Sequence, residues 1–127
     1  MMTIHVSCRI GLVLALTCLI TLTAEAQRQM ETLGRGVVAV RTSSTNVLVG
    51  WRLLGADPDD VGFNVYRSTD GDSPVKLNDA PVTNVTEYAD PVADLTRTNA
   101  WFVCPVTNGV EWAASAAFTL PAGSPVR

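Results

Sequence analysis

Residues 62–68 have the sequence GFNVYRS, in which large side chains fall into two alternating sets. In an extended strand one set faces one side of the sheet and the other set faces the opposite side. The first set is Phe63, Val65 and Arg67, and the second is Asn64 and Tyr66. Residues 70–72 (DGD) follow, and an Asp-Gly pair is a strong hairpin-turn signal. This segment predicts a half-buried β-strand that enters a tight turn.

Short runs of the same kind occupy most of the chain, and no helical pattern of useful length interrupts them. Strands are predicted at residues 36–41, 46–53, 62–68, 75–77, 86–89, 99–107 and 110–120, with a break inside the last. The polar residues 43–46 predict a hairpin between the first two strands, and Asn108-Gly109 is the best two-residue hairpin turn. The pattern predicts an all-β fold, a fibronectin type III or immunoglobulin-like β-sandwich of about seven strands.

Two details of this β-pattern carry specific expectations. Within the second strand one face is predicted to hold Val47, Val49, Trp51 and Leu53. Pro105 lies inside the sixth strand, and proline lacks the N–H that a ladder needs. Pro105 therefore predicts that this strand is an edge strand or contains a bulge.

The first 26 residues are typical of a secretory signal peptide, with the apolar run expected as a signal helix. Arg9 precedes the apolar run 10–22, which is too short for a comfortable membrane span. Ala24-Glu25-Ala26 matches the small-x-small cleavage pattern and predicts cleavage between Ala26 and Gln27. We expect a secreted protein, extracellular or periplasmic, with no membrane attachment after cleavage. A short membrane anchor and a lipidated Cys18 are the less favoured alternatives.

The sequence predicts three parts: 1–26 as signal peptide, 27–121 as β-sandwich and 122–127 as the start of a linker. Cleavage of the signal peptide would remove His5 and two of the three cysteines, leaving Cys104 alone. No intramolecular disulfide is then possible, and Cys104 is expected to be a small buried apolar residue. Without imidazole, Ser-His-Asp and Cys-His catalysis and the usual zinc sites are excluded from the mature chain.

The net charge of the chain bears on which classes of partner it can bind. Nine basic and twelve acidic residues give the 127-residue chain a net charge of −3 and a pI near 4.9. Binding to nucleic acid or to an anionic membrane requires a basic face, so neither partner is expected.

The candidate sites are few and individually weak. Trp112 follows a tight turn, and an exposed indole could stack on a sugar ring. Acidic turns at residues 57–60 and 70–72 could hold calcium, although solvated turn aspartates are commoner. Asn84-Val85-Thr86 is a glycosylation sequon whose use depends on the source. Five arginines could bind uronate carboxylates, but surface salt bridges are the default expectation: Arg35, Arg41, Arg52, Arg67 and Arg97. We therefore predict no catalytic and no metal-binding residue.

Several short motifs occur together in a fixed order. They are QME (29–31), LGRGVVAV (33–40), VGWRLLG (49–55), DP (57–58), GFNVYR (62–67), KLN (76–78), TEYAD (86–90), PV (105–106) and NGVE (108–111). This ordered set resembles the N-terminal β-domain of the family 11 polysaccharide lyases, the rhamnogalacturonan lyases.

The resemblance implies a small fibronectin-like domain joined to a much larger β-propeller. In that family the propeller carries the active site and calcium ions and cleaves the rhamnogalacturonan I backbone of pectin by β-elimination. No catalytic residue of the family maps onto this chain, and no cofactor is expected in it. We expect a non-catalytic domain that packs on the propeller and leaves an exposed apolar patch on one sheet. The alternatives are a carbohydrate-binding module for pectic polysaccharide and, less favoured, an independent enzyme.

Overall fold

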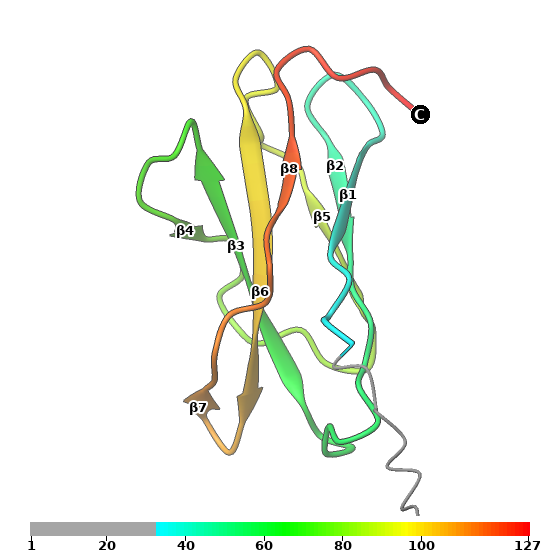
Figure 1. Cartoon of the computed structure of the whole chain (residues 1–127), viewed down its shortest axis with the longest axis vertical. Helices are drawn as coiled ribbons and strands as arrows, with labels where there is room; N and C mark the ends of the chain where they lie inside the picture. Colours follow the sequence, from blue (N-terminus) through cyan, green and yellow to red (C-terminus); the bar gives the residue numbers. More distant parts are fainter. Residues whose placement is uncertain (1–32) are drawn as a thin grey trace, which may run out of the picture. The chain divides into compact units, whose positions relative to one another are not determined.

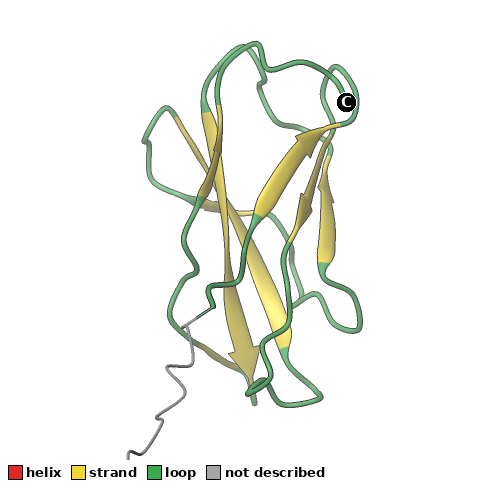
Figure 2. Ribbon diagram, turned by 45° about the vertical axis from the view of Figure 1, so that its right-hand side comes forward, coloured by secondary structure: helices red, strands yellow, loops and turns green. Residues whose placement is uncertain are grey.

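The computed structural model describes residues 33–127, which form eight strands and no helix (Figure 2). The strands are β1 (Val38–Arg41), β2 (Val47–Gly50), β3 (Gly62–Thr69), β4 (Val75–Lys76), β5 (Glu87–Asp90), β6 (Asn99–Thr107), β7 (Val110–Glu111) and β8 (Phe118–Leu120). The predicted signal peptide and its Ala26–Gln27 cleavage point lie outside the described residues. Within the described part, no helix is long and apolar enough to cross a membrane.

The strands form two antiparallel sheets (Figure 1). Sheet A has the order β1-β2-β5, and sheet B has the order β4-β3-β6-β7, with β8 also paired to β6. The long pair β3·β6 forms the centre of sheet B and runs in register from Gly62↔Val106 to Thr69↔Asn99. The predicted all-β sandwich is therefore confirmed, and the last predicted strand is split into β7 and β8.

The core lies between the two sheets and is built from the inward-facing set of each strand. It consists of Val37, Ala39, Val47, Val49, Trp51, Val61, Phe63, Val65, Ala93, Leu95, Trp101 and Val103. The alternation predicted within the second and third strands is confirmed, and one set of each faces the core, with one exception. Leu53 is 57% exposed, because β2 ends at Gly50 and the chain has left the sheet before Leu53.

The hairpins follow the turn chemistry of the sequence. The β1·β2 hairpin is confirmed, and its turn is held by Ser43 Oγ, which accepts from the Asn46 N–H at 3.0 Å. The β6·β7 turn has φ angles of 51° at Asn108 and 75° at Gly109. Two successive positive φ angles are typical of a type I′ turn, whose twist matches that of paired strands.

Pro105 disturbs sheet B without placing β6 at its edge. β6 lies between β3 on one side and β7 and β8 on the other, so the edge-strand alternative is wrong. Pro105 O accepts from Trp112 N at 2.8 Å, but proline has no N–H to return the bond. The β6·β7 ladder accordingly stops at Val106↔Glu111. Farther along β6, the Val103 N–H donates to a side chain, Ser115 Oγ, at 3.0 Å.

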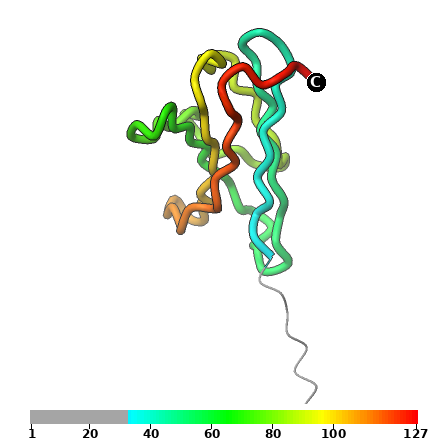
Figure 3. The backbone as a smooth tube through the Cα atoms, turned by 45° about the horizontal axis from the view of Figure 1, so that its top comes forward, coloured from blue at the N-terminus to red at the C-terminus, as the bar shows by residue number. Residues whose placement is uncertain are grey.

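The C-terminal segment after β8 lies against β1, as the red end of the tube in Figure 3 shows. Arg41 donates to Ser124 O at 2.7 Å, and Arg127 N donates to Arg41 O at 2.9 Å. Residues 122–127, which the sequence predicts as the start of a linker, therefore contact sheet A.

Candidate functional site

Trp112 is exposed and borders a shallow hollow at the end of the sandwich where β3 begins and β6 ends. Trp112 is 59% exposed as a residue, and the hollow has a volume of about 320 Å³. The apolar lining is Pro58, Val61, Pro105 and Trp112, and the polar lining is Arg35, Asp57 and Thr107. Of the two positions open to Trp112 from the sequence, buried or exposed, the structure has the exposed one.

The indole of Trp112 is held by the hairpin that precedes it. Trp112 Nε1 donates a 2.7 Å hydrogen bond to Thr107 Oγ1, across the β6·β7 turn. Trp112 N also donates to Pro105 O, so both ends of the residue are fixed to β6. A ring restrained in this way presents its apolar face with little further loss of rotamer entropy on contact.

Arg35 and Asp57 form a bidentate ion pair on the wall of the hollow. Arg35 Nη1 and Nη2 donate to the two carboxylate oxygens of Asp57, the second bond at 2.7 Å. Their side chains are only 11% and 12% exposed. The Arg35 hydrogen bonds, and that of the Leu54 N–H, hold the pKa of Asp57 below its ordinary value. Asp57 thus binds an arginine within the acidic turn considered for calcium.

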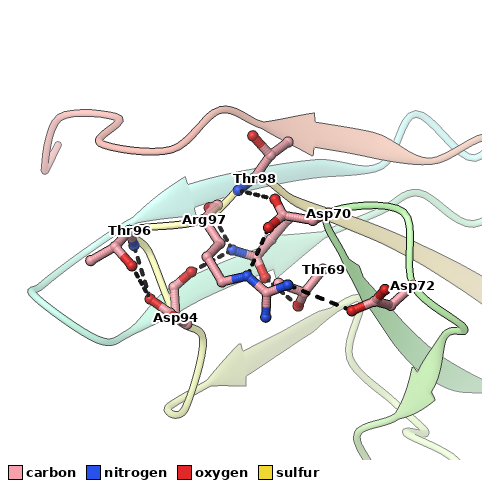
Figure 4. A network of polar contacts seen from close by, with 8 residues as sticks. Thr69, Asp70, Asp72, Asp94, Thr96, Arg97 and Thr98 are labelled. Atoms are coloured by element: carbon pink, nitrogen blue, oxygen red, sulfur yellow. Dashed lines mark hydrogen bonds and ion pairs between the residues drawn. The ribbon is translucent and has the colours of Figure 1, made fainter.

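The second acidic turn is part of another arginine network (Figure 4). Arg97 Nε donates to Asp70 Oδ2 at 2.7 Å, and Arg97 Nη2 lies 3.6 Å from Asp72 Oδ2. The Arg97 hydrogen bond, with that of the Thr98 N–H, lowers the pKa of Asp70. The Arg97 network joins the β3–β4 turn to the segment before β6. Among residues 33–127 no group of three or more His, Cys, Asp or Glu side chains could hold a metal ion.

Arg67 forms an internal ion pair, not the predicted surface pair. Arg67 belongs to β3 of sheet B, whereas Arg52 follows β2 of sheet A. Arg67 Nη1 donates to Asp90 Oδ2 at 2.5 Å, and Trp101 Nε1 donates to the same oxygen at 3.0 Å. Asp90 is 1% exposed, so this contact connects the two sheets inside the core.

The outer face of sheet B carries a polar cluster. Glu111 Oε2 accepts from Asn64 Nδ2 and from the Tyr66 hydroxyl, the latter at 2.8 Å, and Tyr66 stacks on Phe102 with ring centroids 5.2 Å apart. The bond to Glu111 raises the pKa of Tyr66 to about 12, and the bonds from Asn64 and Tyr66 lower the pKa of Glu111. At neutral pH the phenol stays protonated and the carboxylate ionised, so neither is matched to general acid–base work.

Cys104 lies beneath this cluster and is 5% exposed, which confirms the expected burial. Burial, followed by the nearby Glu111 charge, raises the pKa of the thiol to about 11. The reactive thiolate is therefore scarce at neutral pH.

The outer face of sheet A is apolar and exposed. Its outward positions on the three strands are Val38, Val40, Leu48, Gly50, Glu87 and Ala89, as the pairs Val40↔Leu48 and Leu48↔Ala89 indicate. Val38 is 49% exposed, Val40 36% and Leu48 39%. We call Val38, Val40, Leu48 and Ala89 the sheet A patch. An apolar patch on one sheet was expected, but its members were not identified from the sequence.

The family of the chain follows from its match to a sequence model. Residues 28–120 match the model of the rhamnogalacturonan I lyase β-sheet domain. The chain belongs to this family. The resemblance carried by the ordered motifs is thereby confirmed.

Two relatives from Bacillus subtilis (strain 168) extend this assignment. The rhamnogalacturonan endolyase YesW is 47% identical over 90 residues, which is 71% of this chain and 13% of YesW. The rhamnogalacturonan exolyase YesX is 35% identical over 85 residues, which is 67% of this chain and 13% of YesX. The chain therefore matches only about an eighth of each of these lyases.

Solved structures support the fold. An Fn3-like protein from Clostridium thermocellum has a TM-score of 0.55 and 26% identity, covering 72% of this chain and 93% of that protein. The FN5 domain of Drosophila Lar has a TM-score of 0.54 and 21% identity, covering 71% of this chain and 96% of that domain. Both likenesses place the sandwich among fibronectin type III-like folds.

Proposed function

We propose that this chain is the non-catalytic β-domain of a secreted rhamnogalacturonan I lyase and that it packs on a catalytic β-propeller and stabilises it. Membership in the lyase β-sheet domain family supports the proposal, as does similarity to both an endolyase and an exolyase. In such an enzyme the propeller would bind calcium and perform β-elimination on the pectin backbone. The β-domain would contribute stability, and none of its residues is assigned a catalytic role.

The observation that carries this proposal is the sheet A patch. Soluble domains rarely leave neighbouring β-branched and leucine side chains exposed across several strands, and such a surface marks a site of contact with another protein part. The outer face of sheet B, with Asn64, Tyr66 and Glu111 in one hydrogen-bonded cluster, offers a polar contrast. Sheet A is therefore the favoured contact surface for a propeller.

Co-expression tests the proposal directly. The chain, carrying an affinity tag, is produced together with the part of YesW that lies outside the segment matching this chain, and the two are purified through the tag. We expect the YesW part to be retained and its thermal unfolding midpoint to rise in the complex, because the patch is then covered.

A double variant and a matched control make the test specific. Val40→Thr with Leu48→Thr should abolish retention, whereas Val75→Thr, which replaces an exposed valine on β4 of sheet B, should leave it intact. Failure of the unchanged chain to retain a folded YesW part would contradict the proposal. Equal retention by the double variant would show that another face makes the contact.

A second function, carbohydrate binding to pectic polysaccharide, is favoured by a separate observation. Trp112 presents a restrained and largely exposed indole beside a hollow. Apolar sugar faces stack on aromatic rings of this kind. Titration of the chain with rhamnogalacturonan I oligosaccharides, followed by Trp fluorescence, tests this function, and a flat response would contradict it.

A further inference from the structure

The hollow beside Trp112 has walls whose chemistry discriminates between the two sugars named in rhamnogalacturonan. We propose that it binds a neutral 6-deoxyhexose unit of the rhamnose type and excludes the galacturonate unit. This inference rests on the second function proposed above, carbohydrate binding, and specifies which sugar unit Trp112 contacts.

The charged groups of the hollow are already paired with each other. Two nitrogens of Arg35 donate to the carboxylate of Asp57. These are the two charged residues of the lining, and their charges neutralise each other. A uronate carboxylate would have to compete with Asp57 for this guanidinium and would lie beside the Asp57 carboxylate. The net charge of −3 on the chain adds to this repulsion.

The backbone of the hollow also offers few free donors. Pro58 and Pro105 have no N–H, and the N–H groups of three other lining residues are used within the protein. Asp57 N donates to Leu54 O, Val61 N to Pro58 O and Trp112 N to Pro105 O. A carboxylate transferred here from water would lose hydration without gaining equivalent hydrogen bonds, which is unfavourable.

A 6-deoxyhexose fits the same walls. Its methyl group and C–H face are apolar and would lie against Trp112, Pro58, Pro105 and Val61. Thr107 Oγ1 accepts from Trp112 Nε1, so its own hydrogen remains able to donate to a sugar hydroxyl. The volume of about 320 Å³ is at the small end of ligand sites, in keeping with one sugar unit.

Calorimetric titration of the whole chain with two probes of equal length tests the inference. One probe is an oligosaccharide of alternating rhamnose and galacturonate, and the other is an oligogalacturonide. We expect the alternating probe to bind at least tenfold more tightly. We also expect it to change Trp fluorescence, because Trp51 and Trp101 are buried and Trp112 is the exposed indole of the described part.

Variants at Trp112 identify the site. Trp112→Ala should weaken binding of the alternating probe about tenfold, a loss of about 1.4 kcal/mol. Trp112→Phe keeps an aromatic face and should lose less. Thermal unfolding of each variant checks that the fold is retained, as expected for an exposed side chain.

The outcomes separate the inference from the function on which it rests. Binding of neither probe rejects carbohydrate binding altogether. Equal or tighter binding of the oligogalacturonide, with loss in Trp112→Ala, keeps the function and overturns the sugar preference. Binding of the alternating probe that is unchanged in Trp112→Ala places the sugar elsewhere and also overturns the inference.

Discussion

Asp90 is a buried carboxylate on which three hydrogen-bond donors converge. It is 1% exposed and accepts hydrogen bonds from Arg67, Trp101 Nε1 and, at 3.2 Å, the Val92 N–H. A buried carboxylate with this set of donors is stable only while all of them remain in place. The sequence places Arg67 on the same strand face as Phe63 and Val65, but its partner on the opposite sheet follows only from the topology.

Replacing Asp90 should therefore be strongly destabilising. Asp90→Ala leaves the Arg67 charge and the Trp101 N–H unpaired in the core and should lower the free energy of unfolding by about 3–5 kcal/mol, measured by urea denaturation. Asp90→Asn keeps an acceptor oxygen and should lose less. A change below about 1 kcal/mol in Asp90→Ala would contradict the role given to this contact.

The Arg35–Asp57 pair should make stability depend on pH. The pKa of Asp57 is below its ordinary value of 3.8 in the folded state. Its stabilising contribution is thus fully present above about pH 5 and is lost as the pH falls through the folded pKa. Asp57→Asn should be less stable than the unchanged chain by about 1.5–3 kcal/mol at pH 7, and this difference should shrink below pH 3.8.

Urea denaturation of both proteins across this pH range provides the measurement. Asp59→Asn, at an exposed position of the same loop, is the matched control and should change stability little at any pH. A difference between Asp57→Asn and the unchanged chain that stayed constant down to pH 2.5 would refute the linkage.

At the scale of the elements, turn residues in the sequence predict where hairpins form, but Pro105 does not predict how β6 pairs with its neighbours. Asn108-Gly109 predicts a hairpin, and both residues adopt the positive φ angles that a type I′ turn needs. Pro105 predicts a disturbance of its strand, but the sequence alone does not give the side of β6 to which its missing N–H points. Because that side faces β7, the strand stays central and the partner strand is interrupted.

Gly109→Ala tests the turn. A Cβ is disfavoured at a φ of 75°, so the substitution should lower the free energy of unfolding by about 1–2 kcal/mol. Gly55→Ala is the control, since Gly55 has neither a positive φ nor a neighbouring atom near the added carbon, and it should be nearly neutral. Equal effects of the two substitutions in thermal unfolding would show that the turn conformation is not the determinant.

At the scale of the whole described domain, the two outer faces differ in chemistry. Alternation within strands grouped the residues of each face from the sequence, because a period of two is sufficient to separate the two faces. The faces that hold Trp51 and Phe63 are the buried ones. The nature of an outer face depends instead on which strands become neighbours. Val38, Leu48 and Ala89 come from distant segments and form one patch only through the order β1-β2-β5.

The sheet A patch should be detectable in the isolated chain. We expect the unchanged chain to enhance the fluorescence of the hydrophobic dye ANS, and Val40→Thr with Leu48→Thr to reduce that enhancement. Because both side chains are partly exposed, the double variant should alter the free energy of unfolding by no more than about 1 kcal/mol. Val75→Thr should retain the dye signal, and a signal unaffected by the double variant would assign it to another surface.

The interruption of the ladder at Pro105 also affects how copies of the domain meet one another. Because of this interruption, one edge of sheet B consists of two short strands, β7 with two residues and β8 with three. The opposite edge strand is β4, which has two residues. A foreign strand needs a long row of unpaired N–H and C=O groups as a template. Sheet B provides no such row, so intermolecular strand addition at this sheet, a first step toward fibrils, has little backbone on which to begin.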